Sequence, residues 1–129
     1  MNILVVDDSL IVRTVLQNTL KTHPHSDSFT FFNAENGEIA LNLLLQKHID
    51  IVFLDWHMPV MTGEELVYKL RENKKFDKLR IIMATTEGGK DAVVKMAKKG
   101  VNGYLVKPFE DQAILKTFNT IYARVKSIS

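Results

Sequence analysis

Five residues that follow or end short aliphatic runs could share one chemical task. They are the carboxylates Asp7, Asp8 and Asp55, the hydroxyl of Thr85 and the ammonium of Lys107. Three carboxylates held together repel one another unless a cation compensates them, and such oxygen ligands suit Mg²⁺. A carboxylate beside Mg²⁺ and a lysine can act as a nucleophile toward phosphorus. If the five converge, their types indicate metal-assisted phosphoryl transfer.

The elements that would position these residues are short runs rich in β-branched and aromatic residues. The runs are Ile3–Val6, Phe29–Phe32, Ile51–Leu54, Ile81–Ala84 and Tyr104–Val106. Continuous aliphatic runs are typical of parallel strands that helices cover on both faces. We therefore predict an α/β fold, a (βα)5 doubly wound, flavodoxin-like fold with a five-stranded parallel sheet of order 2-1-3-4-5. Sites in such sheets lie at the carboxyl ends of the strands.

Apolar residues at helical spacing follow each run and predict five helices. Gly100 stands where the residue after the fourth helix often adopts a left-handed conformation. The expected stripes are Val12, Val15, Leu16 and Leu20; Ile39, Ala40, Leu43 and Leu44; Leu66, Val67 and Leu70; Val93, Met96 and Ala97; and Ile114, Leu115, Phe118, Ile121, Tyr122 and Val125.

Composition narrows the class of protein further. The length of 129 residues suits a single domain, 1–129. The absence of cysteine excludes a disulfide scaffold, an iron–sulfur cluster and thiol catalysis. A formal net charge of +2 does not indicate nucleic-acid binding, and no apolar run suits a membrane span or signal peptide, so we expect a cytoplasmic protein.

Each candidate residue also has a purely structural interpretation. Asp8 or Ser9 could cap the next helix, and Thr85 could be a half-buried strand residue. The pair His23 and His25 resembles a metal clip, but we expect a plain surface loop there. With no His/Cys cluster at ligand spacing, zinc is a poor candidate. The joint occurrence of polar groups at successive strand ends favours the functional interpretation, with Asp55 as the nucleophile.

These residues carry a resemblance that covers nearly the whole chain. The motifs are Asp7-Asp8, the segment from Asp55 to Gly63 (Asp-Trp-His-Met-Pro-Val-Met-Thr-Gly), Thr85-Thr86 and the segment from Tyr104 to Phe109. In this order they resemble the receiver domain of two-component response regulators, and are most similar to the single-domain chemotaxis regulators of that family.

The resemblance implies a role for each site residue. Asp55 would be the phosphoacceptor and take its phosphoryl group from a phosphohistidine of a sensor histidine kinase. Mg²⁺ would be bound by the carboxylates of Asp8 and Asp55 and by the backbone carbonyl of His57, with Asp7 acting through a metal-bound water. Lys107 would contact the phosphoryl group, across a cis bond to Pro108.

The resemblance also implies a switch and an output. Thr85 would swing toward the phosphoryl group, and Tyr104 would rotate inward and reshape the surface of the fourth helix, fifth strand and fifth helix. That surface would bind an effector such as a flagellar motor switch protein. His57 and Glu87 would tune dephosphorylation. We expect a monomer that catalyses only its own phosphorylation and dephosphorylation, with a possible phosphatase partner and neither DNA binding nor membrane insertion.

Three other functions stay open at this point. A phosphorelay intermediate would pass the group on to a histidine phosphotransfer protein. An aspartate-nucleophile hydrolase would share the Asp, Lys and Mg²⁺ chemistry, but that family favours an Asp-x-Asp pair and a cap domain. A flavin-binding module would share the fold, but the acidic loop Asp7-Asp8-Ser9 would repel the cofactor phosphate.

Overall fold

Five parallel strands form one sheet in the computed structural model, which describes residues 1–128. The strand order is β2-β1-β3-β4-β5, which confirms the predicted fold class. The strands are β1 (Asn2–Val6), β2 (Thr30–Ala34), β3 (Ile51–Leu54), β4 (Arg80–Thr85) and β5 (Gly103–Val106).

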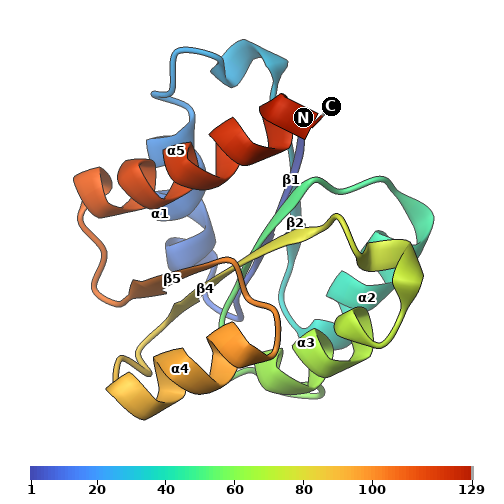
Figure 1. Cartoon of the computed structure of the whole chain (residues 1–129). Helices are drawn as coiled ribbons and strands as arrows, with labels where there is room; N and C mark the ends of the chain where they lie inside the picture. Colours follow the sequence, from blue (N-terminus) through green and yellow to red (C-terminus); the bar gives the residue numbers. More distant parts are fainter. Residues whose placement is uncertain (129) are drawn as a thin grey trace.

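Helices cover both faces of the sheet, with α1 and α5 on one face and α2, α3 and α4 on the other (Figure 1). Two short 3-10 helices, η1 and η2, lie in the connections. The helices are α1 (Leu10–Leu20), η1 (Ser26–Ser28), α2 (Gly37–Gln46), α3 (Gly63–Arg71), η2 (Lys74–Phe76), α4 (Lys90–Lys98) and α5 (Asp111–Ile128). Within residues 1–128, none of them combines the length and the apolar character that a membrane span requires.

The central strands supply a hydrophobic core on each side of the sheet. Alternate residues of β1 point to opposite faces, so Leu4 packs toward α2 and α3 while Ile3 and Val5 pack toward α1 and α5. This two-sided burial is what the uninterrupted aliphatic runs predict. The edge strand β2 differs, because its Phe31 and Phe32 are only half-buried.

Local signals set the helix boundaries close to the acidic residues. Ser9 caps α1, and its hydroxyl accepts a hydrogen bond from the amide of Val12 (3.3 Å). Thr62 caps α3 in a capping box with Glu65. Gly100 follows α4 with φ of 97°, which confirms the predicted left-handed residue.

Three positions of the predicted apolar stripes are wrong. Val15, Ile39 and Ala97 are exposed, the first two at 41% and 38%. Each neighbours a residue of the same stripe that is buried or half-buried, and successive helical residues are about 100° apart around the axis. The sheet therefore covers a narrower face of each helix than the sequence pattern indicates.

The expectation of a plain surface loop at His23 is also wrong. Its ring is 7% exposed and packs against Phe29, Phe118 and Tyr122. Nε2 lies 2.8 Å from Oδ1 of Asn119, and Nδ1 accepts the backbone N–H of His25 (3.0 Å). Both ring nitrogens are engaged, so this histidine is a core residue that holds α5 against the loop after α1.

Candidate functional site

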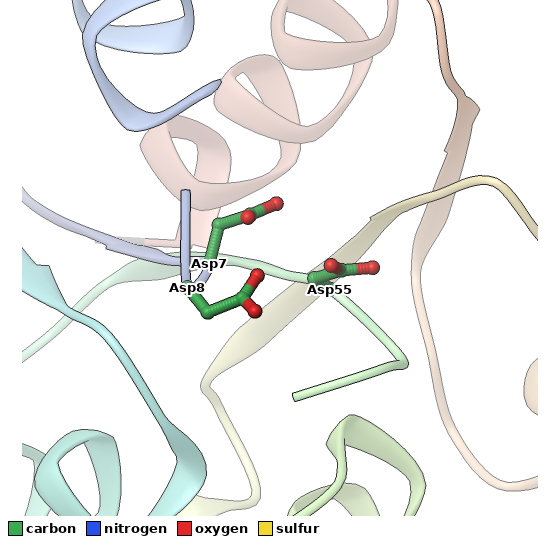
Figure 2. A group of neighbouring side chains, drawn as sticks. All are labelled: Asp7, Asp8 and Asp55. Atoms are coloured by element: carbon green, nitrogen blue, oxygen red, sulfur yellow. The ribbon is translucent and has the colours of Figure 1, made fainter. Parts of the chain in front are cut away.

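The ends of the neighbouring strands β1 and β3 bring three carboxylates together. Val6 pairs with Leu54 in register, and the amide of Asp55 donates to the carbonyl of Val6 (3.0 Å). Figure 2 shows Asp7 and Asp8 leaving the end of β1 with their carboxylates directed toward Asp55. Carboxylate oxygens of the three residues lie within 4.8 Å of one another. The predicted convergence is present.

The three carboxylates differ in their surroundings. Asp7 and Asp55 are 1% and 5% exposed, whereas Asp8 is exposed. The buried pair accepts local backbone hydrogen bonds, Asp7 Oδ1 from the amide of Ser9 (2.9 Å) and Asp55 Oδ1 from that of Trp56 (2.8 Å). These bonds fix the two side chains and leave their second oxygens directed at the site.

Lys107 supplies the positive charge that faces these second oxygens. Its Nζ lies 2.7 Å from Asp7 Oδ2 and 3.2 Å from Asp55 Oδ2. Its amide donates to the carbonyl of Thr85 (2.8 Å), and its peptide bond to Pro108 is cis. Burial alone would lower the pKa of Lys107, but the hydrogen bond to Asp7 and the charge of Asp55 outweigh burial and raise it.

The pKa of Asp7 is raised. Burial is the largest cause, the neighbouring charge of Asp55 adds to it, and the hydrogen bonds from Lys107 and Ser9 oppose both. Three carboxylates thus share one ammonium, which leaves an excess of negative charge at this strand edge. Clustered hard oxygen donors with excess negative charge fit Mg²⁺. The assignment of Asp8 and Asp55 as direct ligands stays a prediction.

The candidate switch residues meet on the backbone of Glu87. Thr85, which ends β4, is fully buried, and its hydroxyl accepts the amide of Glu87 at 3.4 Å. Tyr104 on β5 is half-buried, and its hydroxyl donates to the carbonyl of Glu87. Burial and then the charge of Glu87 raise the pKa of Tyr104.

A side-chain hydrogen bond links two residues that follow the strand ends. His57 Nε2 is 2.7 Å from Oε1 of Glu87, and both side chains are about half exposed. The pair joins the loop after β3 to the loop after β4. The two residues that the resemblance assigns to tuning thus contact each other, which sequence analysis did not predict.

Two further residues that support the site were missed. A Cβ on Gly63 would lie 2.1 Å from the carbonyl oxygen of Asp55, so only glycine allows α3 to approach the acidic residue this closely. Arg13 on α1 donates through Nη1 to the carbonyl of Asp7. Gly63 lies within the recognised motif, but nothing local in the sequence indicates the reach of Arg13.

The fold and this acidic strand edge define a class of doubly wound α/β domain, and comparison with known proteins identifies it. A family model described as the response regulator receiver domain matches residues 3–119. The chain belongs to the response regulator receiver domain family.

Within this family the chain is of the CheY type. The chemotaxis protein CheY homolog of Campylobacter jejuni is 45% identical over 115 residues, which are 88% of this chain and 86% of the relative. Chemotaxis protein CheY1 of Helicobacter pylori is 39% identical over 122 residues, 94% and 96% of the two chains. Among solved structures, the chemotaxis response regulator CheY4 of Vibrio cholerae superposes with a TM-score of 0.82 at 32% identity, covering 93% of this chain and 97% of that one.

These similarities support two-component signalling and chemotaxis as the setting of the protein. Receiver domains of this type are signalling proteins rather than turnover enzymes, and they bind Mg²⁺ at an acidic pocket.

Proposed function

We propose that residues 1–129 act as a single phospho-accepting receiver that takes a phosphoryl group on Asp55 from a sensor histidine kinase. The observation that carries this proposal is the convergence of Asp7, Asp8 and Asp55 with the ammonium of Lys107 at one strand edge. The CheY-type relatives support a kinase as donor of the phosphoryl group. They also support an effector such as the flagellar motor switch as the partner of the phosphorylated chain.

In the transfer step, a carboxylate oxygen of Asp55 attacks the phosphorus of the kinase phosphohistidine. A P–O bond forms, the P–N bond breaks, and its electron pair goes to the imidazole nitrogen. Lys107 stabilises the negative phosphoryl oxygens, and it already lies 3.2 Å from Asp55. The carboxylates of Asp8 and Asp55 and the carbonyl of His57 would hold Mg²⁺, with Asp7 acting through water. The bound cation would add positive charge at the phosphoryl oxygens.

Phosphorylation then alters the contacts around Glu87. A phosphoryl group adds roughly −1.5 to −2 charges and three acceptor oxygens, so the Thr85 hydroxyl gains a stronger partner. Thr85 and Tyr104 both bind the Glu87 backbone, so a movement of one changes the position of the other. We propose that this movement reshapes the surface of α4, β5 and α5, where the effector binds.

The hydrogen bond between His57 and Glu87 tunes dephosphorylation in this proposal. The two side chains contact each other, and they follow Asp55 and Thr85 by two residues each. His57→Ala and Glu87→Ala each remove the same contact, so both change the phospho-Asp55 lifetime in the same direction and the double variant adds little. Opposite effects of the two single variants would contradict the pairing.

The decisive experiment follows the fluorescence of Trp56, the single tryptophan, which adjoins Asp55 and is half-buried. Titration with Mg²⁺ and then beryllofluoride or acetyl phosphate changes the emission of the native protein. In Asp55→Asn the response to the phosphoryl analogues is lost, while circular dichroism shows an intact fold. A response that persists in the variant would overturn the phosphoacceptor assignment.

A second experiment separates effector binding from a phosphorelay. A phospho-Asp55 lifetime matched to signalling, with beryllofluoride-dependent capture of a motor-switch protein, supports the chemotaxis role. Rapid transfer of the group to a histidine phosphotransfer protein, without such capture, would favour the relay.

A further inference from the structure

The end of the sheet opposite the acidic site contains a surface hollow of about 400 Å³. It lies where α2 ends, between the segments that lead into β3 and β4, and the last turns of α5 border it (Figure 1). Small-molecule sites in proteins typically measure about 300–1,000 Å³, so the hollow is of adequate size for one compact ligand.

The floor of the hollow is apolar. Its buried side chains are Leu44, Ile49, Phe76 and Leu79, all part of the core on the α2 and α3 face. The wall includes Leu45, which is 47% exposed although it is a large apolar residue. A ligand with an apolar body would remove this surface from water at a gain of roughly 25 cal/mol per Å².

The rim is cationic. Lys47, Lys75 and Lys78 border the hollow and are exposed. Within residues 1–128, none of these ammonium groups lies at ion-pair distance from a carboxylate. Lys75 donates to the carbonyl of Leu45 (3.0 Å), which offsets the negative end of the α2 dipole. Lys47 Nζ lies 5.5 Å from the ring centroid of Phe32, a weak contact that leaves its charge unneutralised, and Lys78 also borders the hollow.

The acidic residue of the lining does not cancel this charge. Asp50 Oδ2 accepts the amide of Asn2 (2.7 Å), and Oδ1 lies 3.0 Å from His48 Nε2. Both oxygens thus have hydrogen-bond partners within the chain, and the single carboxylate charge leaves the three lysines of the lining in excess. The combination of an apolar floor with an uncompensated cationic rim selects molecules that are apolar at one end and negative at the other.

We propose that this hollow is a second binding site, for a small organic anion with a compact aromatic or branched aliphatic body. The body occupies the floor beside Leu45, and a carboxylate, sulfonate or phosphate group faces Lys47 and Lys78. The site is at the other end of the sheet from Asp55, so it is independent of the phosphoryl chemistry proposed above. The volume of about 400 Å³ favours a small molecule over a folded partner, whose contacts would extend over a broad surface.

The test uses two dyes with similar bodies and different charge on the full chain. Anilinonaphthalene sulfonate is anionic, and N-phenylnaphthylamine is its neutral counterpart. We expect saturable fluorescence enhancement with the anion at one site per chain, weakened by salt, and an affinity at least about tenfold lower for the neutral dye. The double variant Lys47→Gln/Lys78→Gln lowers the affinity for the anion about tenfold, and Leu45→Gln lowers that for both dyes.

Matched controls make the outcomes decisive. Lys21→Gln/Lys116→Gln removes two exposed lysines outside the lining and leaves dye binding unchanged. Melting temperature and the Trp56 response to Mg²⁺ stay native in all variants, so a loss of dye binding is not a loss of fold. No saturable binding, equal affinity for the two dyes, or equal loss in both double variants would overturn the proposal. Displacement of the dye by an acidic leucine-containing peptide, but by no small carboxylate, would show that the ligand class is wrong.

Discussion

The two ends of the sheet are opposite in charge and in packing. At the carboxyl end, three carboxylates face a single lysine, and the surrounding backbone is tightly packed. At the amino end, three exposed lysines surround an apolar hollow of about 400 Å³. The charged side chains at both ends belong mostly to the segments that connect strands and helices. The carboxyl end holds charged side chains in a fixed geometry, whereas the amino end leaves an open hollow.

Backbone geometry sharpens this comparison. At the carboxyl end Val60 adopts φ of 72°, a left-handed conformation that a β-branched residue rarely accepts. Three residues after Val60, Gly63 brings the start of α3 against the carbonyl of Asp55. Unfavourable local conformations persist where the surrounding structure requires them, and they gather at functional sites. The amino end has no comparable requirement at the residues that line the hollow.

The largest effect is expected from Gly63→Ala. The added Cβ would lie 2.1 Å from the Asp55 carbonyl oxygen, so α3 must move away from the site. We expect a loss of about 3 kcal/mol in the free energy of unfolding, measured by urea denaturation, and a weakened Trp56 response to Mg²⁺. Gly89→Ala is the matched control, because nothing lies within 4 Å of its added Cβ and its φ is −66°. Equal stability of the two variants would refute the close packing at the carboxyl end.

Gly63 and Gly89 differ in what surrounds them, and this difference shows which features the sequence could predict. Uninterrupted aliphatic runs predicted the central strands and hence the convergence of Asp7 and Asp55, because strand ends follow from local pattern and parallel topology. Glycine itself does not reveal what lies near it. The packing of Gly63 on Asp55 depends on the arrangement of the loop, which the recognised motif indicates only by its residue types.

Contacts between distant segments were the part that sequence could not predict. His23 is buried because Phe118 and Tyr122 of α5 cover it, and nothing in its own neighbourhood marks it as a core residue. The contact of His57 with Glu87 likewise joins two loops 30 residues apart. Local patterns predict elements, whereas such contacts require the positions of the elements relative to one another.

Removal of the compensating charge at the carboxyl end has the next largest effect. Lys107→Gln leaves the buried Asp7 and Asp55 without their ammonium partner, and we expect a loss of about 2 kcal/mol in metal-free buffer. Added Mg²⁺ recovers part of the loss, because ligand binding stabilises the folded state. Lys95→Gln breaks a partly exposed pair with Glu64 (2.9 Å) and costs clearly less, because solvent screens the Lys95 charge. A metal-free Lys107 variant as stable as native protein would contradict the buried pairing.

Asp7→Asn has a smaller effect of the opposite sign. The pKa of Asp7 is raised in the fold, chiefly by burial, so folding favours its neutral form. Stability of the metal-free native protein therefore rises as the pH falls through the native pKa toward the unfolded value, and falls as the pH rises. At neutral pH, Asp7→Asn raises Tm by about 3 °C and removes this pH dependence. The control Asp27→Asn changes an exposed carboxylate, and a Tm increase of equal size there would show that burial is not the cause.

Val60→Gly tests the strain at the carboxyl end with a still smaller effect. Glycine adopts positive φ without steric cost, but it also increases the entropy of the unfolded chain. Relief of the left-handed conformation outweighs that entropy, and we expect a gain of about 0.5 kcal/mol in urea denaturation. Val60→Asn, which also tolerates this conformation, gains a similar amount. If both variants are less stable than native protein, the loop at Val60 stores no backbone strain.

The smallest effect is expected at the amino end. Lys78 is exposed and borders the hollow, so Lys78→Gln changes the free energy of unfolding by less than about 0.5 kcal/mol. The same Lys-to-Gln substitution is expected to cost about four times as much or more at Lys107, because the cation there compensates buried carboxylates. Urea denaturation of the two variants under identical metal-free conditions measures this ratio. A charge that contributes little to stability, yet whose removal weakens the binding of an anionic dye, acts on a ligand rather than on the fold. A large loss of stability in Lys78→Gln would instead make the cationic rim a structural feature and remove the difference between the two ends.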